Sequence, residues 1–192
     1  MSVSLSTHAR VRMQQRGISP EALELLLDIG HVAVFRSLAH DAKVDAELEV
    51  QLFEALQKKD VPELRSLSRK LGARTREALE LLPELYGGAE VLDTAQKRLP
   101  KLPALTQALK TLRALAKSCP VPVSFDLAEL RGYHYHSGVV FDAYGAGGTG
   151  PASASILIAR GGRYDEVGKA FGRARPATGF SIDLRSVAGV VK

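Results

Sequence analysis

The residues best suited to chemistry lie in one short stretch, 131 to 144, which reads Arg-Gly-Tyr-His-Tyr-His-Ser-Gly-Val-Val-Phe-Asp-Ala-Tyr. One Arg, two Tyr and two His fall within six positions, and an alternating apolar pattern follows at once. An arginine fork binds a carboxylate through two parallel charge-assisted hydrogen bonds. Neighbouring rings can contact an aromatic ring and hydrogen-bond to it. The stretch therefore predicts a pocket for a small, charged ligand that carries a ring.

Individual roles within the stretch follow from residue type. Arg131 is the candidate for a carboxylate, and Tyr135 and His136 are the candidates for an imidazole ring. Gly132 permits the sharp backbone turn that would bring these neighbours close to a ligand. The same residues also fit a surface loop whose aromatic side chains lead into a sheet. Residue types alone leave both interpretations open.

A sheet is the element that must position this stretch. Val121, Val123 and Phe125 alternate with other residues at a period of two, which predicts a strand. Further strands are predicted over 139–144, 153–159 and 177–182, with short helices near 165–171 and 184–190. Gly145 to Gly150 lacks the Lys-Ser/Thr ending of a phosphate-binding loop, so we predict a flexible turn between two strands there.

Helices are predicted throughout residues 31–118, ahead of that sheet. Asp60-Val61-Pro62-Glu63 has the form of a capping box, and leucines recur at helical spacing after it. Gly72, Gly87 and Gly88 interrupt the pattern, as do Pro100 and Pro103. The last long helix carries an apolar stripe made of Leu105, Leu109, Leu112 and Leu115.

The chain divides into three predicted regions: a basic leader with one short helix (1–30), a helical region (31–118) and an antiparallel sheet (119–192). In the leader, Ser19 is a good N-cap, Pro20 suits the first helical position and Gly30 can end the helix. Helices followed by a mostly antiparallel sheet predict an α+β fold and argue against a doubly wound one.

Composition excludes several classes of protein. The 192 residues are 45% hydrophobic and 24% charged, which is ordinary for one globular domain with or without a small appendage. Cys119 is the only cysteine, so no internal disulfide can form and a reducing, cytoplasmic location is expected. There is no apolar run long enough for a transmembrane helix and no secretory signal pattern. The net charge of +5 is weak evidence for a nucleic-acid partner.

Three segments carry a family resemblance. Asp126 to Tyr144 contains an Arg-Gly-x-x-Tyr-x-[Ser/Thr]-Gly core that leads into Val-Phe-Asp. Residues 161–165 read Gly-Gly-Arg-Tyr-Asp, and residues 178–184 read Thr-Gly-Phe-Ser-Ile-Asp-Leu. Together, in this order, they resemble the histidine loop, a second signature and the motif-three strand of histidyl-tRNA synthetases. The resemblance implies a class II synthetase-like antiparallel sheet with flanking helices.

Departures from that pattern point to a non-catalytic branch. The synthetases continue Arg-Gly with Leu-Asp-Tyr-Tyr, whereas this chain has Tyr133, His134, Tyr135 and His136. The motif-three arginine that clamps ATP belongs two residues beyond Leu184, where this chain has Ser186. Segments 27–39, 58–62 and 82–88 also resemble the regulatory subunits of short-form ATP phosphoribosyltransferase. That family senses histidine in the first step of histidine biosynthesis.

The resemblance assigns residues and partners. It implies histidine contacts from Arg131, Tyr135 and His136, with Tyr133 as a further candidate, and it implies no catalytic residue, metal or cofactor. The second signature also contains Arg163 and Tyr164. Gly161 and Gly162 are expected to form a tight turn and Tyr164 to pack, which favours a structural role for this signature. The implied partners are the short catalytic subunit, histidine as effector and further copies of the chain, with no membrane and no nucleic acid.

Two features keep other functions open. Motifs one and two of class II folds do not precede residue 27, and only about four strands are predicted, so the chain looks truncated. A degenerate histidyl-tRNA synthetase fragment is therefore an alternative. Residues 1–27 resemble the start of a short bacterial domain of unknown function, and His8, Arg12 and Arg16 share one helical face. A nucleic-acid-binding module that acts through this leader is the second alternative.

Overall fold

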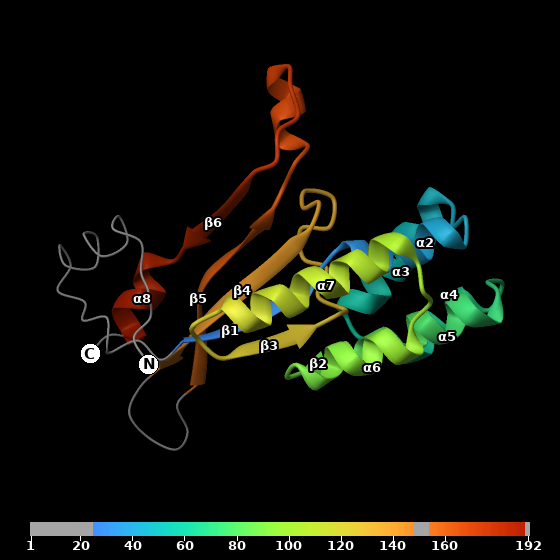
Figure 1. Cartoon of the computed structure of the whole chain (residues 1–192), viewed down its shortest axis with the longest axis horizontal. Coiled ribbons are helices and arrows are strands. Elements are labelled where there is room, and N and C mark those ends of the chain that lie inside the picture. Colours follow the sequence, from blue (N-terminus) through green and yellow to red (C-terminus); the bar gives the residue numbers. More distant parts are fainter. Residues whose placement is uncertain (1–24, 148–153, 191–192) are drawn as a thin grey trace.

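The structure is a computed structural model that describes residues 25–147 and 154–190. Within them, six strands form one mixed sheet in the order β2-β3-β1-β4-β5-β6. The strands are β1 (Leu25–His31), β2 (Tyr86–Gly87), β3 (Val123–Asp126), β4 (Val139–Gly147), β5 (Ala154–Arg163) and β6 (Thr178–Ile182). Only the β1–β3 pair is parallel among these strands. The predicted α+β class is confirmed (Figure 1).

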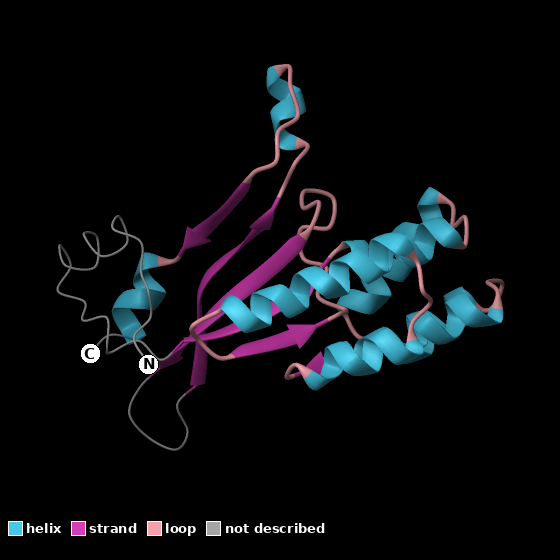
Figure 2. Ribbon diagram, viewed as in Figure 1, coloured by secondary structure: helices cyan, strands magenta, loops and turns pink. Residues whose placement is uncertain are grey.

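Most of the helices come between β1 and β3 in the sequence. It comprises α2 (Ala33–Asp41), α3 (Ala46–Gln57), α4 (Val61–Ser68), α5 (Ala73–Leu81), the 3₁₀ turn η2 (Leu82–Glu84), α6 (Glu90–Arg98) and α7 (Pro103–Ser118). Two further helical segments lie closer to the C-terminus. The 3₁₀ helix η3 (Val167–Phe171) follows β5, and α8 (Leu184–Val190) follows β6. Figure 2 shows α2 to α7 gathered beside β1, β3 and β4, whereas β5 and β6 extend away from them.

Side-chain caps and a proline begin several of these helices, and the predicted capping box at Asp60 is one of them. Asp60 Oδ1 accepts a hydrogen bond from the backbone N–H of Glu63 at 3.0 Å, and Asp45 Oδ1 caps α3 in the same way. Pro103 is the first residue of α7, a position that needs no N–H donor. Helices α2 to α7 lie within residues 31–118, where the sequence pattern predicts helices, and the short strand β2 interrupts them.

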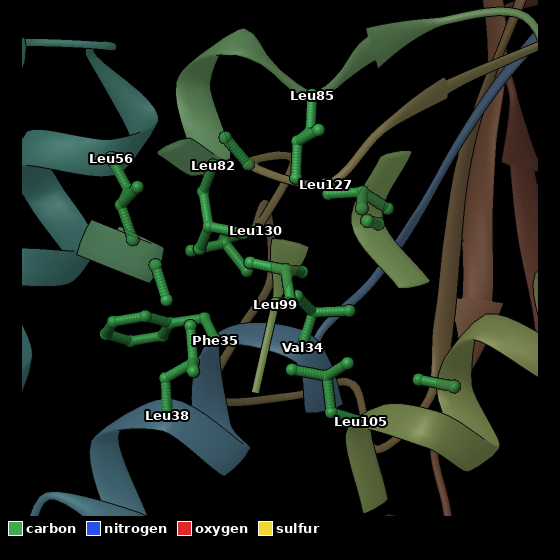
Figure 3. Packing of buried hydrophobic residues seen from close by; sticks show 14 of the residues in the cluster. Val34, Phe35, Leu38, Leu56, Leu82, Leu85, Leu99, Leu105, Leu127 and Leu130 are labelled. Atoms are coloured by element: carbon green, nitrogen blue, oxygen red, sulfur yellow. The ribbon is translucent and has the colours of Figure 1, made fainter. Parts of the chain in front are cut away.

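One apolar core joins these helices to the sheet. Phe35 and Leu38 from α2 pack with Leu82 and with Leu105 of α7 (Figure 3). Leu127 and Leu130, in the chain that follows β3, are fully buried in the same cluster. Because burying a leucine side chain stabilises a fold by roughly 1.5–3 kcal/mol, these two residues anchor the segment that leads to residue 131.

The predicted short helix of the leader is wrong where the structure describes it. Residues 25–31 form β1, which lies between β3 and β4 in the centre of the sheet. The leucine-rich run in these residues is compatible with a helix or with a buried strand. It forms a strand because it pairs with β3 on one side and β4 on the other. Gly30 does not end a helix but lies within β1. Glycine is needed there for close packing, because a Cβ atom would lie 2.8 Å from the carbonyl oxygen of Glu129. Ser19 and Pro20 lie outside the described residues.

The sheet has more strands than the sequence pattern predicted. The four predicted strands correspond to β3, β4, β5 and β6, and β1 and β2 are additional. The predicted glycine-rich turn at 145–150 is wrong at its start, because Gly145 and Gly147 continue β4 in pairing with β5. The rest of that turn lies outside the described residues. At one edge of the described sheet, β6 exposes Phe180 and Ile182.

Candidate functional site

The segment after β3 is bent so that its side chains project to two sides. Gly132 has a φ of +68°, a left-handed conformation that side chains rarely adopt. Its carbonyl oxygen accepts hydrogen bonds from the backbone N–H groups of Tyr135 and His136, both at 2.8 Å. A Cβ atom at this position would lie 2.5 Å from His136 Nδ1, so the bend also needs glycine for space.

A pocket of about 500 Å³ opens beside this bend. Arg131, Tyr135 and His136 line it from the loop, Gly161 and Tyr164 from β5 and the residue after it, and Phe180 from β6. Its volume falls in the range of small-molecule sites, about 300–1,000 Å³. Three of the four residues predicted to contact a ligand thus meet in one cavity.

Arg131 is held in place by two carboxylates. Its guanidinium contacts Glu129 at 2.7 Å and Asp142 of β4 at 2.8 Å, while its side chain stays 47% exposed. The hydrogen bond to Glu129 raises the pKa of Arg131, so the side chain is a permanent cation. The half-exposed side chain of Arg131 lines the pocket, so it places a positive charge where an anionic group can approach.

Charges of both signs line the pocket floor because of the strand register. Asp142 of β4 pairs with Arg160 of β5, and Arg160 pairs with Ser181 of β6. Directly paired residues point to the same face of a sheet, so these three side chains form one polar row. Arg160 Nε lies 3.5 Å from Asp142 Oδ1. Glu129, Asp142 and Arg160 are the functional candidates that sequence patterns missed.

Aromatic rings form the wall above that floor. The Tyr135 and Tyr164 rings lie 4.9 Å apart, and the His136 ring meets the Tyr135 ring edge-on at 5.2 Å. Tyr135 is 51% exposed and lines the pocket, so part of its side chain is accessible to a ligand. Such a wall suits a flat ring by stacking or edge contact.

Two predicted site residues lie elsewhere. Tyr133 is only 3% exposed and packs against the rings of Phe35 and Phe53, on the helical side of the loop. Arg163 is exposed and pairs with Asp165 at 3.0 Å, outside the pocket lining. The hydrogen bond from Arg163 holds the pKa of the Asp165 carboxyl below its usual value.

The expected tight turn at Gly161 and Gly162 is wrong, because both residues lie within β5. They pair with Phe141 and Val140 of β4 on one side and with Phe180 and Gly179 of β6 on the other. A Cβ atom on Gly161 would lie 2.3 Å from the Gly179 carbonyl oxygen, and one on Gly162 would lie 2.6 Å from His136 Cδ2. Both glycines therefore allow close packing around the pocket.

Two titratable groups of β1 lie near the site. Burial raises the pKa of Asp28, whose Oδ1 is buried with no hydrogen-bond partner among the described residues. Burial lowers the pKa of His31 to about 4, and its Nδ1 accepts from the backbone N–H of Ala33 at 3.2 Å. His31 is therefore neutral at physiological pH and holds the start of α2.

Two kinds of feature are not found in the part of the chain that the structure describes. Residues 25–147 and 154–190 contain no cluster of three or more His, Cys, Asp or Glu side chains that could hold a metal ion. Over the same residues, no helix combines the length and the apolar character that crossing a membrane requires.

Sequence comparison relates the chain to one family model and to several curated proteins. The family model described as histidyl-tRNA synthetase matches residues 17–187. An "ATP phosphoribosyltransferase regulatory subunit" of Ralstonia pickettii (strain 12J) is 52% identical over 87% of this chain and 42% of its own length. One of Azoarcus sp. (strain BH72) is 55% identical over 84% of this chain and 41% of its own length. The chain thus spans less than half the length of these curated relatives.

Solved structures agree in fold. An "ATP phosphoribosyltransferase regulatory subunit/histidyl-tRNA synthetase" from Bacillus halodurans superposes with a TM-score of 0.74 at 25% identity, over 96% of this chain and 48% of that one. The histidyl-tRNA synthetase from Nostoc sp. PCC 7120 gives 0.64 at 19% identity, over 100% and 49%. An "ATP phosphoribosyl transferase (HisG:HisZ) complex" from Thermotoga maritima gives 0.58 at 22%, over 82% and 53%. The last two show the fold alone.

Proposed function

The chain belongs to the histidyl-tRNA synthetase family, and on that premise we propose that it is a non-catalytic, histidine-binding regulatory subunit of short-form ATP phosphoribosyltransferase. Its catalytic partner would be the separate short subunit that carries out the first step of histidine biosynthesis. The names of the relatives at 52% and 55% identity support the regulatory role. The single cysteine fits a reducing compartment, so we place the protein in the cytoplasm.

The observation that carries the proposal is the chemistry of the pocket. A free amino acid at neutral pH has a carboxylate and an ammonium group, and histidine adds an imidazole ring. Arg131 and Arg160 offer cations for the carboxylate, and Glu129 and Asp142 offer anions for the ammonium group. Tyr135 and His136 supply the aromatic wall for the imidazole. Arg131, Tyr135 and His136 are thus the proposed histidine contacts.

The buried position of Tyr133 gives it a different role from that of the pocket residues. Its hydroxyl and ring are both engaged with helices α2 and α3, so a contact with histidine would require the loop to open. Gly161, Gly162, Arg163 and Tyr164 of the second signature are proposed to be structural, with Tyr164 supporting the Tyr135 ring.

The non-catalytic part of the proposal rests on the start of α8. Asp183 Oδ1 accepts from the backbone N–H groups of Arg185 and Ser186, at 2.9 and 3.2 Å, and so begins the helix. The ATP-clamping arginine of synthetases belongs at the position of Ser186. Arg185 is one residue early, which turns its side chain about 100° around the helix. We infer that amino-acid activation with ATP is lost.

Two measurements on the whole chain test the function. Isothermal calorimetry with histidine should give saturable binding, and the short catalytic subunit should be retained by the immobilised chain. Arginine, which has the same zwitterionic end but no imidazole, is the matched control ligand and should bind more weakly. Absence of both interactions would exclude the proposal. Histidine-dependent pyrophosphate exchange should stay at background, and measurable exchange would instead identify a synthetase fragment.

A further inference from the structure

The loop over residues 131–137 has a second face, turned away from the pocket. Tyr133 occupies it and is 3% exposed. Its ring centroid lies 5.4 Å from that of Phe35 in α2 and 5.3 Å from that of Phe53 in α3. The same short loop therefore presents Tyr135 and His136 to the pocket and inserts Tyr133 between two helices.

Arg36 of α2 holds this loop by its backbone. Its Nη2 atom donates to the carbonyl oxygen of Tyr133 at 2.9 Å and to that of His136 at 3.4 Å. Its guanidinium carbon also lies 4.7 Å from the centroid of the Tyr133 ring, a cation–π arrangement. One side chain thus fixes the two ends of the turn on which Tyr135 sits.

The hydroxyl of Tyr133 completes the attachment. It donates to Glu49 Oε1 of α3 in a short hydrogen bond. Burial and, after it, that bond raise the pKa of Tyr133 to about 12, so the phenol stays protonated and remains a donor at neutral pH. A hydrogen bond to a charged acceptor is about twice as strong as a neutral one.

We propose that Arg36, Tyr133 and Glu49 form a latch that positions the pocket loop and links its shape to helices α2 and α3. All three are positioning residues, because they act on the ligand only through Tyr135 and His136. A latch that holds the loop in its binding shape spares the ligand the cost of ordering it. Because such coupling is reciprocal, a bound ligand should in turn stabilise the contacts of the latch with helices α2 and α3. The inference rests on the proposed function for the identity of the ligand, histidine. The effect of the latch on the loop does not depend on that function.

The test uses the full chain and three substitutions. Tyr133→Phe removes the donor and keeps the ring, Glu49→Ala removes the acceptor, and Glu49→Gln keeps a neutral acceptor. Glu47→Ala is the matched control, since Glu47 is exposed in the same helix. Tyr133→Phe and Glu49→Ala both remove the hydrogen bond between the Tyr133 hydroxyl and Glu49. We expect each variant to bind histidine with a Kd about tenfold weaker than the wild type. Glu49→Gln should recover most of that loss, and Glu47→Ala should bind like the wild type.

Amide hydrogen exchange without ligand separates the latch from the proposed function. In Tyr133→Phe and Glu49→Ala, the amides of Tyr135 and His136 should exchange about tenfold faster, while those of α7 keep their protection. If the wild type binds no histidine, the histidine-binding part of the proposed function fails, and the exchange result still tests the latch. Unchanged exchange at Tyr135 and His136 overturns the latch. Faster exchange with unchanged histidine affinity overturns its role in binding.

Discussion

The helical half of the molecule and the outer sheet are built on different principles. Helices α2 to α7 share one continuous apolar cluster with β1 and β3, in which Phe35, Leu64 and Leu112 have no exposed surface. Around the outer strands, the second cluster has just two buried members among the described residues, Ala143 and Ile158. The outer sheet instead presents charged side chains and exposed rings to the pocket.

The buried core and the candidate ligand site therefore lie mainly in different parts of the molecule. The helical half supplies the buried area that keeps the chain folded, and it anchors the pocket loop through Leu127, Leu130 and Tyr133. The outer sheet contributes Asp142, Arg160 and Phe180 to the pocket, next to the loop that carries the proposed histidine contacts. These side chains take no part in the buried apolar clusters. Substitutions in the two regions should therefore have separable effects on unfolding and on histidine affinity.

The largest expected effect contrasts two phenylalanines. Phe35→Ala empties a fully buried site in the helical half and should lower the free energy of unfolding by about 3–5 kcal/mol. Phe180→Ala, at a position that is 67% exposed on β6, should change it by no more than about 0.5 kcal/mol. Urea unfolding followed by circular dichroism measures both. Equal losses of unfolding free energy in the two variants would contradict the proposed difference between the helical half and the outer sheet.

His31 lies where β1 meets α2, between the two regions. Its folded pKa of about 4 is below the usual 6.5 because burial disfavours the charged ring. Above pH 6.5 the ring is neutral in both states. As the pH falls from 6.5 toward 4 the unfolded chain takes up the proton first, so stability drops by a quantity on the order of 3 kcal/mol.

A substitution isolates that contribution. His31→Asn places an acceptor near the position of Nδ1 for the Ala33 N–H but does not titrate. The fall in urea midpoint between pH 6.5 and 4 should be clearly smaller in this variant than in the wild type. His40→Asn, at an exposed position on α2, serves as control and should retain the full pH dependence. Identical profiles for His31→Asn and wild type would refute the assignment.

The outer sheet should be sensitive to added volume at one place. Gly161→Ala would push a methyl group against the Gly179 carbonyl and Phe180, so we expect a loss of about 1–3 kcal/mol together with weaker histidine binding. Gly189→Ala has open space around its Cβ and lies within α8, so it should be neutral or slightly stabilising. Thermal unfolding of the two variants makes the comparison, and equal behaviour would remove the packing role of Gly161.

Local sequence patterns predicted the elements whose periodicity is strong. The leucine stripe of α7 and the alternation in β3 are visible without tertiary information. The cap residues Ser19, Pro20 and Gly30 predict a helix that would include residues 25–30, and the period of an apolar run does not distinguish a helix from a buried strand. Only pairing with β3 and β4 decides the matter.

The site was predictable in part for a similar reason. Arg131, Tyr135 and His136 are neighbours in sequence, so one motif reveals them. Arg160 reaches Asp142 only through the register of β4 and β5, which no local pattern specifies. The direction of Tyr133 depends on the bend at Gly132 and on a gap between α2 and α3, so its packing against the helices could not be foreseen.

The most direct test is a calorimetric titration of histidine into the wild type, Arg131→Ala and Arg163→Ala. Arg131→Ala should weaken binding by about 1.5–3 kcal/mol, the scale of a hydrogen bond to a charged group. Arg163→Ala removes an arginine from outside the pocket and should bind like the wild type. Wild-type affinity in Arg131→Ala, or no binding heat in the wild type, would contradict a histidine pocket centred on this guanidinium.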